Sequence, residues 1–320
     1  MNSLKHGVSR SLGYALLAAA TLAAVLSGCG GGTSQIEPFA PTRILAFGDE
    51  SSVITADGKK YTVNGFDTTT LVASCVVNPI WVQSLAASFG LVFGECNPDK
   101  IAAPTGVMYA VPGAKVADLK TKIDAHFAVS SFGSKDLAAI LVGANDVLEL
   151  YAQFPAQSQA SLLDEVRARG RNLGNQVNRI ANAGGRVIIA TLPDMGLTPF
   201  ALKEKAAKLD TDRSAFLSNL TSEFNIAMRL TIINDGRLIG LVLADESVQA
   251  IVKYPAAFGF ANVTDAACLG TIAIQNCLPT TLVTGGSGDT WLWASDVLLS
   301  PAGQARLGAL AQTRAKNNPF

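Results

Sequence analysis

Short apolar runs alternate with longer amphipathic segments along most of the chain. The runs have the length of strands and are apolar at nearly every position instead of at every second one. Such runs are typical of strands covered on both faces, as in a parallel sheet. The predicted core strands are residues 44–47, 107–111, 137–142, 187–190 and 238–243.

Between these runs, apolar residues recur at every third or fourth position, which predicts helices. Val116, Leu119 and Ile123 share one face of such a segment. Strands that alternate with helices predict a three-layer α/β/α fold with a doubly wound parallel sheet of about five strands. The predicted helices are residues 79–89, 115–127, 160–183 and 212–232, and a last helix begins at Pro301.

One segment after the first strand departs from this alternation. Residues 52–55 and 60–63 are β-prone and enclose Asp57 and Gly58. An Asp-Gly pair between two such runs favours a hairpin. We therefore predict a small hairpin here.

The beginning of the chain predicts a secretion signal. Lys5 and Arg10 precede an apolar stretch, residues 11–26, that is too short and too rich in alanine to favour a permanent membrane span. It leads into the sequence Leu-Ser-Gly-Cys, which resembles a bacterial lipobox with Cys29 as the lipidated residue. The alternative is an ordinary cleaved signal followed by an incidental cysteine.

Lipidation of Cys29 implies anchoring to a membrane of the bacterial envelope. Several acyl chains on one cysteine give a stable anchor. A glycine after the cysteine, where an aspartate would retain the protein in the inner membrane, favours the outer membrane by the same resemblance, with the protein facing the periplasm. The predicted organisation is a signal peptide at residues 1–28, a flexible tether at 29–42 and one domain at 43–320.

The charge balance does not favour a nucleic-acid partner, which would need a basic face. The chain has 25 basic and 25 acidic residues, and removal of Lys5 and Arg10 with the signal leaves 23 against 25, or a net charge of −2. Nothing in the sequence implies a metal or an organic cofactor.

The four cysteines after Cys29 agree with an oxidising compartment. Four cysteines allow three pairings. We favour the sequential pairs, Cys75 with Cys96 and Cys268 with Cys277. A metal site is the alternative, but no histidine lies near these residues and their spacings are not those of metal ligands.

Each of the first four core strands leads into a short block that contains glycine, proline or polar residues. The blocks are Phe-Gly-Asp-Glu at 47–50, Pro-Gly-Ala at 112–114, Gly-Ala-Asn-Asp at 143–146 and Leu-Pro-Asp at 192–194. The carboxyl ends of parallel strands lie at one edge of the sheet, where ligands of open α/β sheets bind. The blocks therefore predict a site at this edge.

Four blocks in this order resemble those of the SGNH/GDSL hydrolases, in particular the lipase and esterase branch found in secreted and autotransporter enzymes. The resemblance extends from about residue 43 to residue 315. It implies that the backbone N–H of Gly113 and the side chain of Asn145 form an oxyanion hole, and that a serine nucleophile stands where this chain has Glu50. Asp49 and Asp146 belong to the family pattern whatever the chemistry.

The catalytic acid and base of the family are also missing. The resemblance places an aspartate and a histidine shortly before the last helix, where this chain has Ser295 and Leu298. A shift of the alignment by one residue gives Asp296 and Leu299, so neither register supplies a histidine.

The two histidines of the chain are His6, in the predicted signal, and His126. His126 is about eleven residues into the helix that follows Gly113, or roughly 16 Å from the site at about 1.5 Å per residue. We expect it to be a partly exposed helix residue without a role in the site.

A carboxylate at the serine position suggests a different use of the hole. We hypothesise that Glu50 fills it and accepts hydrogen bonds from Gly113 and Asn145, against repulsion from Asp49 and Asp146.

The predicted function is that of an envelope lipoprotein of this family, catalytically inactive, which binds an acyl, glycan or other small ligand, or an envelope protein, in the former active-site cleft. One alternative is an active ester hydrolase in which Glu50 serves as nucleophile or general base beside Gly113 and Asn145. A glycosidase with a carboxylate pair from Asp49, Glu50 and Asp146 is a further alternative. A structural lipoprotein with a closed cleft is the last.

Overall fold

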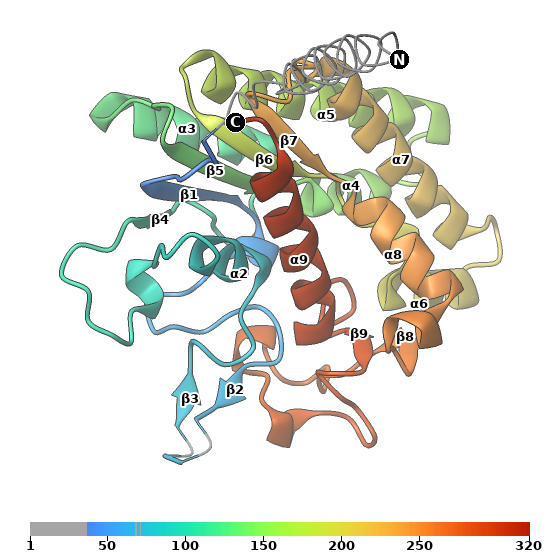
Figure 1. Ribbon diagram of the computed structural model, residues 1–320. Helices are drawn as coiled ribbons and strands as arrows, with labels where there is room; N and C mark the ends of the chain where they lie inside the picture. The colour runs from blue at the N-terminus through green and yellow to red at the C-terminus, as the bar shows by residue number, and fades with distance from the viewer. Residues whose placement is uncertain (1–36, 68, 71) are drawn as a thin grey trace, which may run out of the picture. The chain divides into compact units, whose positions relative to one another are not determined.

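Five parallel strands form the central sheet of the computed structural model, in the order β4-β1-β5-β6-β7 (Figure 1). The structure describes residues 37–67, 69–70 and 72–320. The predicted signal peptide, Cys29 and most of the predicted tether lie outside these residues. The strands are β1 (Arg43–Gly48), β4 (Gly106–Met108), β5 (Asp136–Leu141), β6 (Arg186–Ala190) and β7 (Ile239–Val242).

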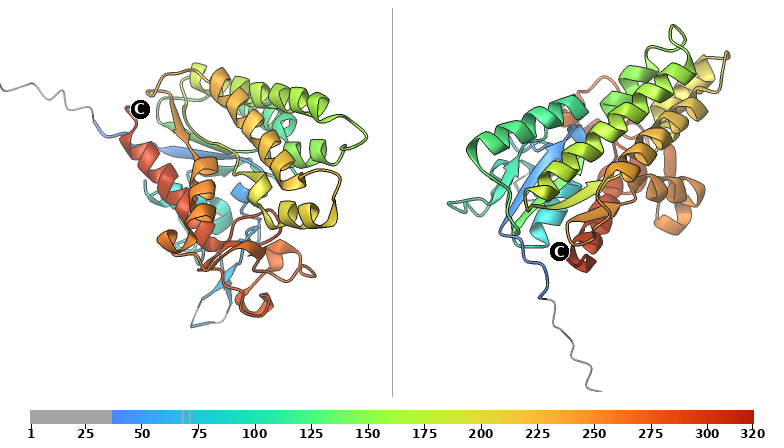
Figure 2. Two further views of the ribbon diagram at one scale, coloured as in Figure 1. Left: turned by 90° about the vertical axis from the view of Figure 1, so that its right-hand side faces the viewer. Right: turned by 90° about the horizontal axis from the view of Figure 1, so that it is seen from above.

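Helices cover both faces of the sheet, so the predicted three-layer α/β/α fold is confirmed (Figure 2). Helices α3, α4, α5, α6 and α7 pack on one face, and α2, α8 and α9 pack on the other. Their bounds are α2 (Trp81–Ala87), α3 (Val116–Val129), α4 (Ala144–Tyr151), α5 (Gln159–Asn182), α6 (Pro199–Ala207), α7 (Arg213–Thr231), α8 (Ala244–Lys253) and α9 (Pro301–Asn317).

The continuous apolar pattern of the strands follows from this double cover. In β1, Leu45 and Phe47 pack into the core beneath α3 and α5, whereas Ile44 and Ala46 pack beneath α2 and α9. All four side chains are fully buried. A polar residue at any of these positions would be removed from water without a partner, which explains why the run contains none.

The structure adds elements that the sequence did not predict. Helices α4 and α8 begin directly after β5 and β7, and α6 follows the Leu-Pro-Asp block after β6. Two short pairs lie outside the central sheet: antiparallel β2 (Gly65–Phe66) with β3 (Ala73–Ser74), and parallel β8 (Asn262–Ala266) with β9 (Trp291–Trp293).

The predicted hairpin around Asp57 is reduced to a turn. A single antiparallel bridge joins Ile54 to Lys60, and no strand forms on either side. The reason lies in the second predicted strand, residues 60–63. The Lys60 side chain points into the protein, so polar and apolar side chains do not alternate between two faces there. Lys60 is fully buried, and its Nζ donates to the carbonyl oxygens of Cys75, Val77 and Asn78 at 2.9, 2.6 and 3.0 Å.

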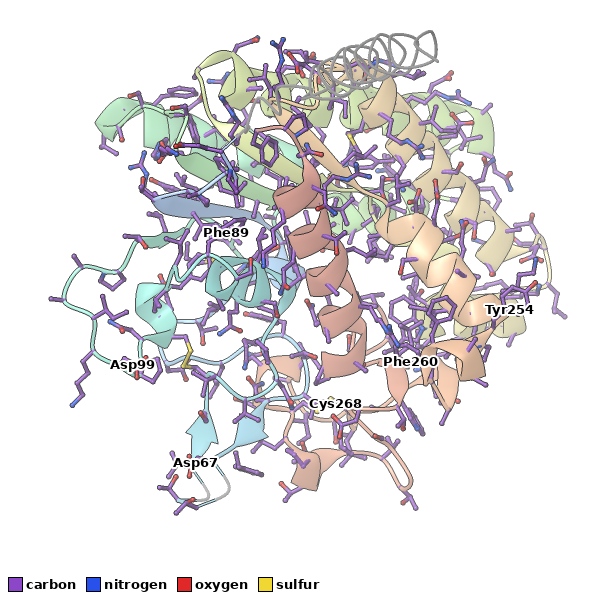
Figure 3. The ribbon with its side chains drawn as sticks, viewed as in Figure 1. Asp67, Phe89, Asp99, Tyr254, Phe260 and Cys268 are labelled. Carbon is purple, nitrogen blue, oxygen red and sulfur yellow. A yellow bond between two sulfur atoms is a disulfide. The ribbon has the colours of Figure 1, made fainter. Side chains whose placement is uncertain are left out.

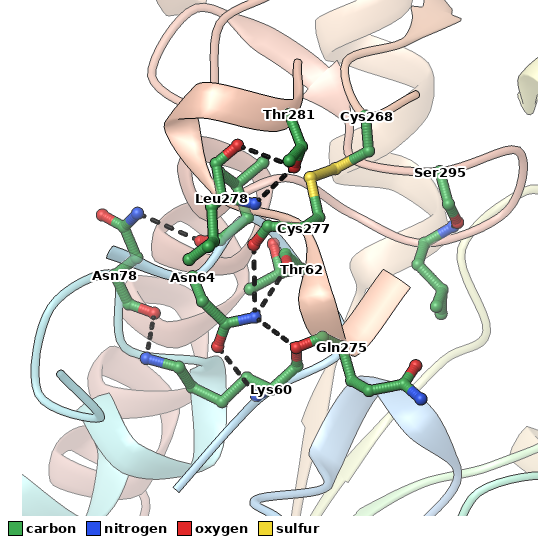
Figure 4. Close-up of a disulfide and its surroundings, with 12 residues drawn as sticks. Lys60, Thr62, Asn64, Asn78, Cys268, Gln275, Cys277, Leu278, Thr281 and Ser295 are labelled. Atoms are coloured by element: carbon green, nitrogen blue, oxygen red, sulfur yellow. Dashed lines mark hydrogen bonds between the residues drawn. A yellow bond between two sulfur atoms is a disulfide. The ribbon is translucent and has the colours of Figure 1, made fainter. Parts of the chain in front are cut away.

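Both predicted disulfides are present, Cys75–Cys96 and Cys268–Cys277 (Figure 3). The first encloses α2, and the second closes a short loop between β8 and β9. The segment from Lys60 to Asn64 links the two, because Lys60 bonds the Cys75 carbonyl while the Asn64 backbone N–H bonds the Cys277 carbonyl at 2.9 Å. Figure 4 shows Lys60 and Asn64 beside the Cys268–Cys277 disulfide.

None of the helices in the described part of the chain is long and apolar enough to span a bilayer. Across the same residues, no group of three or more histidine, cysteine, aspartate or glutamate side chains is arranged to hold a metal ion.

Candidate functional site

The turn after β1 places Glu50 at the carboxyl edge of the sheet. Gly48 has a φ of +143°, and a Cβ there would lie 2.0 Å from the carbonyl oxygen of Leu141, so only glycine fits. Asp49 then caps a short 3-10 turn, Glu50–Ser52, by accepting a hydrogen bond from the N–H of Ser51 at 3.0 Å. This turn directs the Glu50 side chain away from the strand.

Gly113 and Asn145 reach the same point from two other strand ends. Gly113 follows β4 with a φ of +75°, in the left-handed region that favours glycine. Asn145 lies in the first turn of α4, and its Nδ2 also donates to the carbonyl oxygen of Ala114 at 3.1 Å. That bond fixes the amide beside the Gly113 turn.

The Glu50 carboxylate accepts a hydrogen bond from each of these donors. The Gly113 N–H donates to Oε1 at 2.6 Å, and the Asn145 Nδ2 donates to Oε2 at 3.0 Å. Each carboxylate oxygen therefore has one donor, in the arrangement that the sequence hypothesis describes. Hydrogen bonds to an ionised acceptor are stronger than neutral ones, each contributing about 1.5–3 kcal/mol.

Asp49 lies next to this carboxylate and is buried, with 1% of its surface exposed. Its Oδ1 accepts from Ser51, but its Oδ2 is buried without a hydrogen-bond partner. Burial, and then repulsion from Glu50, raises the pKa of Asp49 to about 7. Asp49 is thus held in an unfavourable position for its ionised form, mainly by burial and additionally by the Glu50 carboxylate.

Asp146 forms contacts that join helices and does not bond the Glu50 carboxylate. Its Oδ2 accepts from the N–H of Val116 at 3.0 Å, and its Oδ1 accepts from Arg169 at 3.4 Å, so it joins α4 to α3 and α5. Burial raises its pKa to about 6, opposed by these two donors. Sequence reasoning did not find Arg169, which a helix pattern does not distinguish from any exposed arginine.

Ser295 and Leu298 form a closed turn before α9. The Ser295 hydroxyl accepts from the N–H groups of Val297 and Leu298 at 3.4 and 3.2 Å, and the Ala294 N–H donates to the Leu298 carbonyl at 2.8 Å. Leu298 is buried, and its neighbour Asp296 pairs with Lys203 on the surface. This turn presents neither an acid nor a base to Glu50.

The expectation that His126 is partly exposed is wrong: only 2% of it is exposed. Its ring lies among aromatic side chains, 4.4 Å from the Phe132 ring and with Nδ1 3.0 Å from the Tyr109 hydroxyl. Desolvation lowers the pKa of His126. The burial arises because α3 packs this face of the helix against β1, which the helical spacing alone did not reveal.

Comparison with known proteins places this fold and site in a family. A family model described as GDSL-like lipase/acylhydrolase matches residues 44–273, well over half of the chain. The chain belongs to this family. The matched range contains Glu50, Gly113 and Asn145, while the turn at Ser295 lies beyond its end.

The relatives of this GDSL-family chain are distant. It is 25% identical over 198 residues to a phosphatidylcholine-sterol acyltransferase of Aeromonas hydrophila, covering 60% of this chain and 54% of that protein. It is 24% identical over 149 residues to a GDSL esterase/lipase of Arabidopsis thaliana, covering 42% and 37%. The matches thus span about half of the first relative and just over a third of the second.

Among solved structures, an acetylxylan esterase of Geobacillus stearothermophilus aligns with a TM-score of 0.44 at 16% identity. The alignment covers 89% of this chain and 99% of that one.

Proposed function

We propose that this GDSL-family chain is an envelope lipoprotein that does not hydrolyse esters, because its own Glu50 occupies the oxyanion hole. The observation that carries the proposal is the pair of hydrogen bonds from Gly113 and Asn145 to the two oxygens of one carboxylate. A substrate carbonyl would have to displace a charged, bidentate internal ligand before it could bind there.

The chemistry of ester hydrolysis supports the same reading. A serine nucleophile needs an adjacent base, and loss of the serine or of the histidine each costs about a million-fold in a serine hydrolase. This chain has glutamate at the serine position, and the histidine in the described part of the chain, His126, is buried beside Tyr109. Because Gly113 and Asn145 already donate to Glu50, they cannot stabilise a developing oxyanion. Loss of one such donor typically lowers the rate about 100–1000-fold.

Use of Glu50 as the nucleophile is disfavoured by the same contacts. Both of its oxygens are held by hydrogen bonds, so attack would require at least one to be broken. The displaced glutamate would then compete with the oxyanion for the two donors. We therefore propose a binding role for the cleft, with the ligand held beside Glu50 and not turned over.

The proposed location follows from the predicted signal, the lipobox-like cysteine and the two disulfides, which are typical of an oxidising compartment. We propose anchoring through Cys29 at the outer membrane. The described domain begins at the amino edge of the sheet, and Glu50 follows β1 at the carboxyl edge, about 20 Å away at roughly 3.3 Å per residue. Glu50 thus lies at the far end of the sheet from the chain's entry into the domain.

The test is an ester-hydrolysis assay on the exported chain carrying Cys29→Ser, with short- and medium-chain p-nitrophenyl esters. We expect wild type and Asn145→Ala to hydrolyse these esters at the same background rate. Turnover that Asn145→Ala lowers by about 100-fold or more would mean that the hole stabilises an oxyanion, and would overturn the proposal.

A further inference from the structure

A cavity lies along α2, and Glu50, Gly113 and Asn145 are not among the residues that line it. It has a volume of about 590 Å³ and is bounded by α2, by the segment that follows α2 and by the last turns of α9. This volume is within the range of about 300–1,000 Å³ typical of small-molecule sites. Figure 3 labels Phe89 and Asp99 on the segment after α2.

The walls of this groove are held by cross-links, so it is formed before any ligand arrives. The Cys75–Cys96 disulfide ties the segment after α2 to the segment before it. The Gly106 N–H donates to the Val92 carbonyl at 2.8 Å, which holds the same wall against β4. A ligand therefore need not order the groove in order to bind.

The groove offers hydrocarbon contact and little hydrogen bonding. Three of the polar side chains in its wall already form hydrogen bonds: Gln83 bonds the Ile80 N–H and the Cys75 carbonyl, Gln312 donates to the Ser84 carbonyl, and Ser88 donates to the Leu85 carbonyl. A peptide would bury backbone groups without partners here. The remaining wall is mainly apolar: Val76, Pro79, Ala86, Ala87, Leu91, Val92, Phe93, Cys96 and Pro98.

Two opposite charges on different walls of the groove would orient a charged ligand. Lys316 lines it from the last turn of α9, and Asp99 lines it from the segment after α2. Within the described residues, neither has an ion-pair partner. An anionic head group is attracted to Lys316 and repelled by Asp99, so a linear anion binds in one orientation.

We propose that this groove binds a linear carboxylic acid, with its hydrocarbon chain along α2 and its carboxylate at Lys316. The site is independent of the proposed function, because none of its lining residues bonds Glu50, Gly113 or Asn145. Binding here involves no covalent step.

The experiment is a calorimetric titration with decanoate, kept below the concentration at which decanoate forms micelles. The protein is the Cys29→Ser chain, from which any non-covalently bound lipid has been extracted. Ala87 is exposed on α2 and lines the groove, so Ala87→Trp fills it without entering the core. We expect at least a tenfold loss of decanoate affinity in this variant. Ala305→Trp, at an exposed position of α9 outside the groove, is the matched control and should bind as wild type does.

Charge reversal at the groove mouth provides a second, independent readout. We expect Lys316→Glu to weaken decanoate binding by about two- to fivefold, as for an exposed ion pair, and Lys208→Glu, an equal charge change outside the groove, to leave it unchanged. Wild type that binds no decanoate, or an Ala87→Trp variant that binds as tightly as Ala305→Trp, would overturn the proposal. So would loss of binding in Glu50→Gln with binding retained in Ala87→Trp, which would place the acid in the cleft.

Discussion

Replacement of Asp49 by asparagine should change how stability depends on pH, because the buried carboxyl holds a proton that the unfolded chain gives up. The pKa of Asp49 is raised from 3.8 to about 7 in the folded protein. Between these values the folded state binds more protons than the unfolded state, so the free energy of unfolding falls as pH rises. Above pH 7 both states are ionised, and the full cost of the buried charge is present.

The magnitude follows from the same shift. One pKa unit corresponds to 1.36 kcal/mol, so a shift of about three units amounts to ~4 kcal/mol at pH 8, of which about 2–3 kcal/mol develops between pH 5 and pH 8. An asparagine in place of Asp49 would keep the oxygen that caps Ser51 but could not ionise. Its amide hydrogens would lack a partner, as Oδ2 does now, which costs about 1–3 kcal/mol at every pH.

Urea unfolding at pH 5, 6, 7 and 8, followed by tryptophan fluorescence, measures this difference. We expect Asp49→Asn to gain about 2–3 kcal/mol relative to wild type between pH 5 and pH 8. Asp289→Asn, an exposed aspartate, serves as the control and should change little. A difference between wild type and Asp49→Asn that stays constant over this range would refute the reasoning.

Three further variants, one of them a double replacement, test the framework of the domain. Lys60→Met should destabilise the fold by about 3 kcal/mol or more, because three backbone carbonyl oxygens lose the buried Lys60 donor. Chemical denaturation beside the neighbouring variant Lys59→Met measures this loss, and equal effects of the two variants would contradict the role assigned to Lys60. Gly48→Ala should give little or no folded protein, because its Cβ would overlap the Leu141 carbonyl; circular dichroism of the exported chain decides this, and a normal melting temperature would be unexpected. Replacing Cys268 and Cys277 together by serine should cost about 2–3 kcal/mol for a loop of this length, and an unchanged denaturation midpoint would show that the disulfide adds no stability.

The sequence predicts those features of the molecule that follow from a single physical requirement, such as burial of a strand on both faces. Residues 44–47 of β1 are buried on both faces and are therefore all apolar, so their pattern identifies both the strand and the sheet type. Because parallel strands end at one edge, the blocks containing Glu50, Gly113 and Asn145 could be expected to meet. Their hydrogen bonds in the structure follow from that topology.

Features that depend on tertiary packing were missed for equally physical reasons. Lysine and histidine are usually exposed, yet Lys60 is enclosed by backbone carbonyls and His126 by aromatic rings, and no local pattern distinguishes such residues from surface ones. Helices α4, α6 and α8 begin within or just after the polar and glycine- or proline-containing segments that follow β5, β6 and β7, and such segments are typical of loops. The Asp146–Arg169 contact joins two helices that only the folded chain brings together.

The central claim is that the Glu50 carboxylate occupies the hole, and the Gly113 amide reports on it directly. In ¹H–¹⁵N spectra of glycine-labelled protein, we expect the Gly113 amide proton to be shifted far downfield and protected from exchange, because it donates to a carboxylate at 2.6 Å. In Glu50→Ala it should move upfield and exchange faster, while Gly259, in another turn of similar φ, stays unchanged. A Gly113 amide that is unaffected by Glu50→Ala would contradict the account, because the hole would then be open in the native protein.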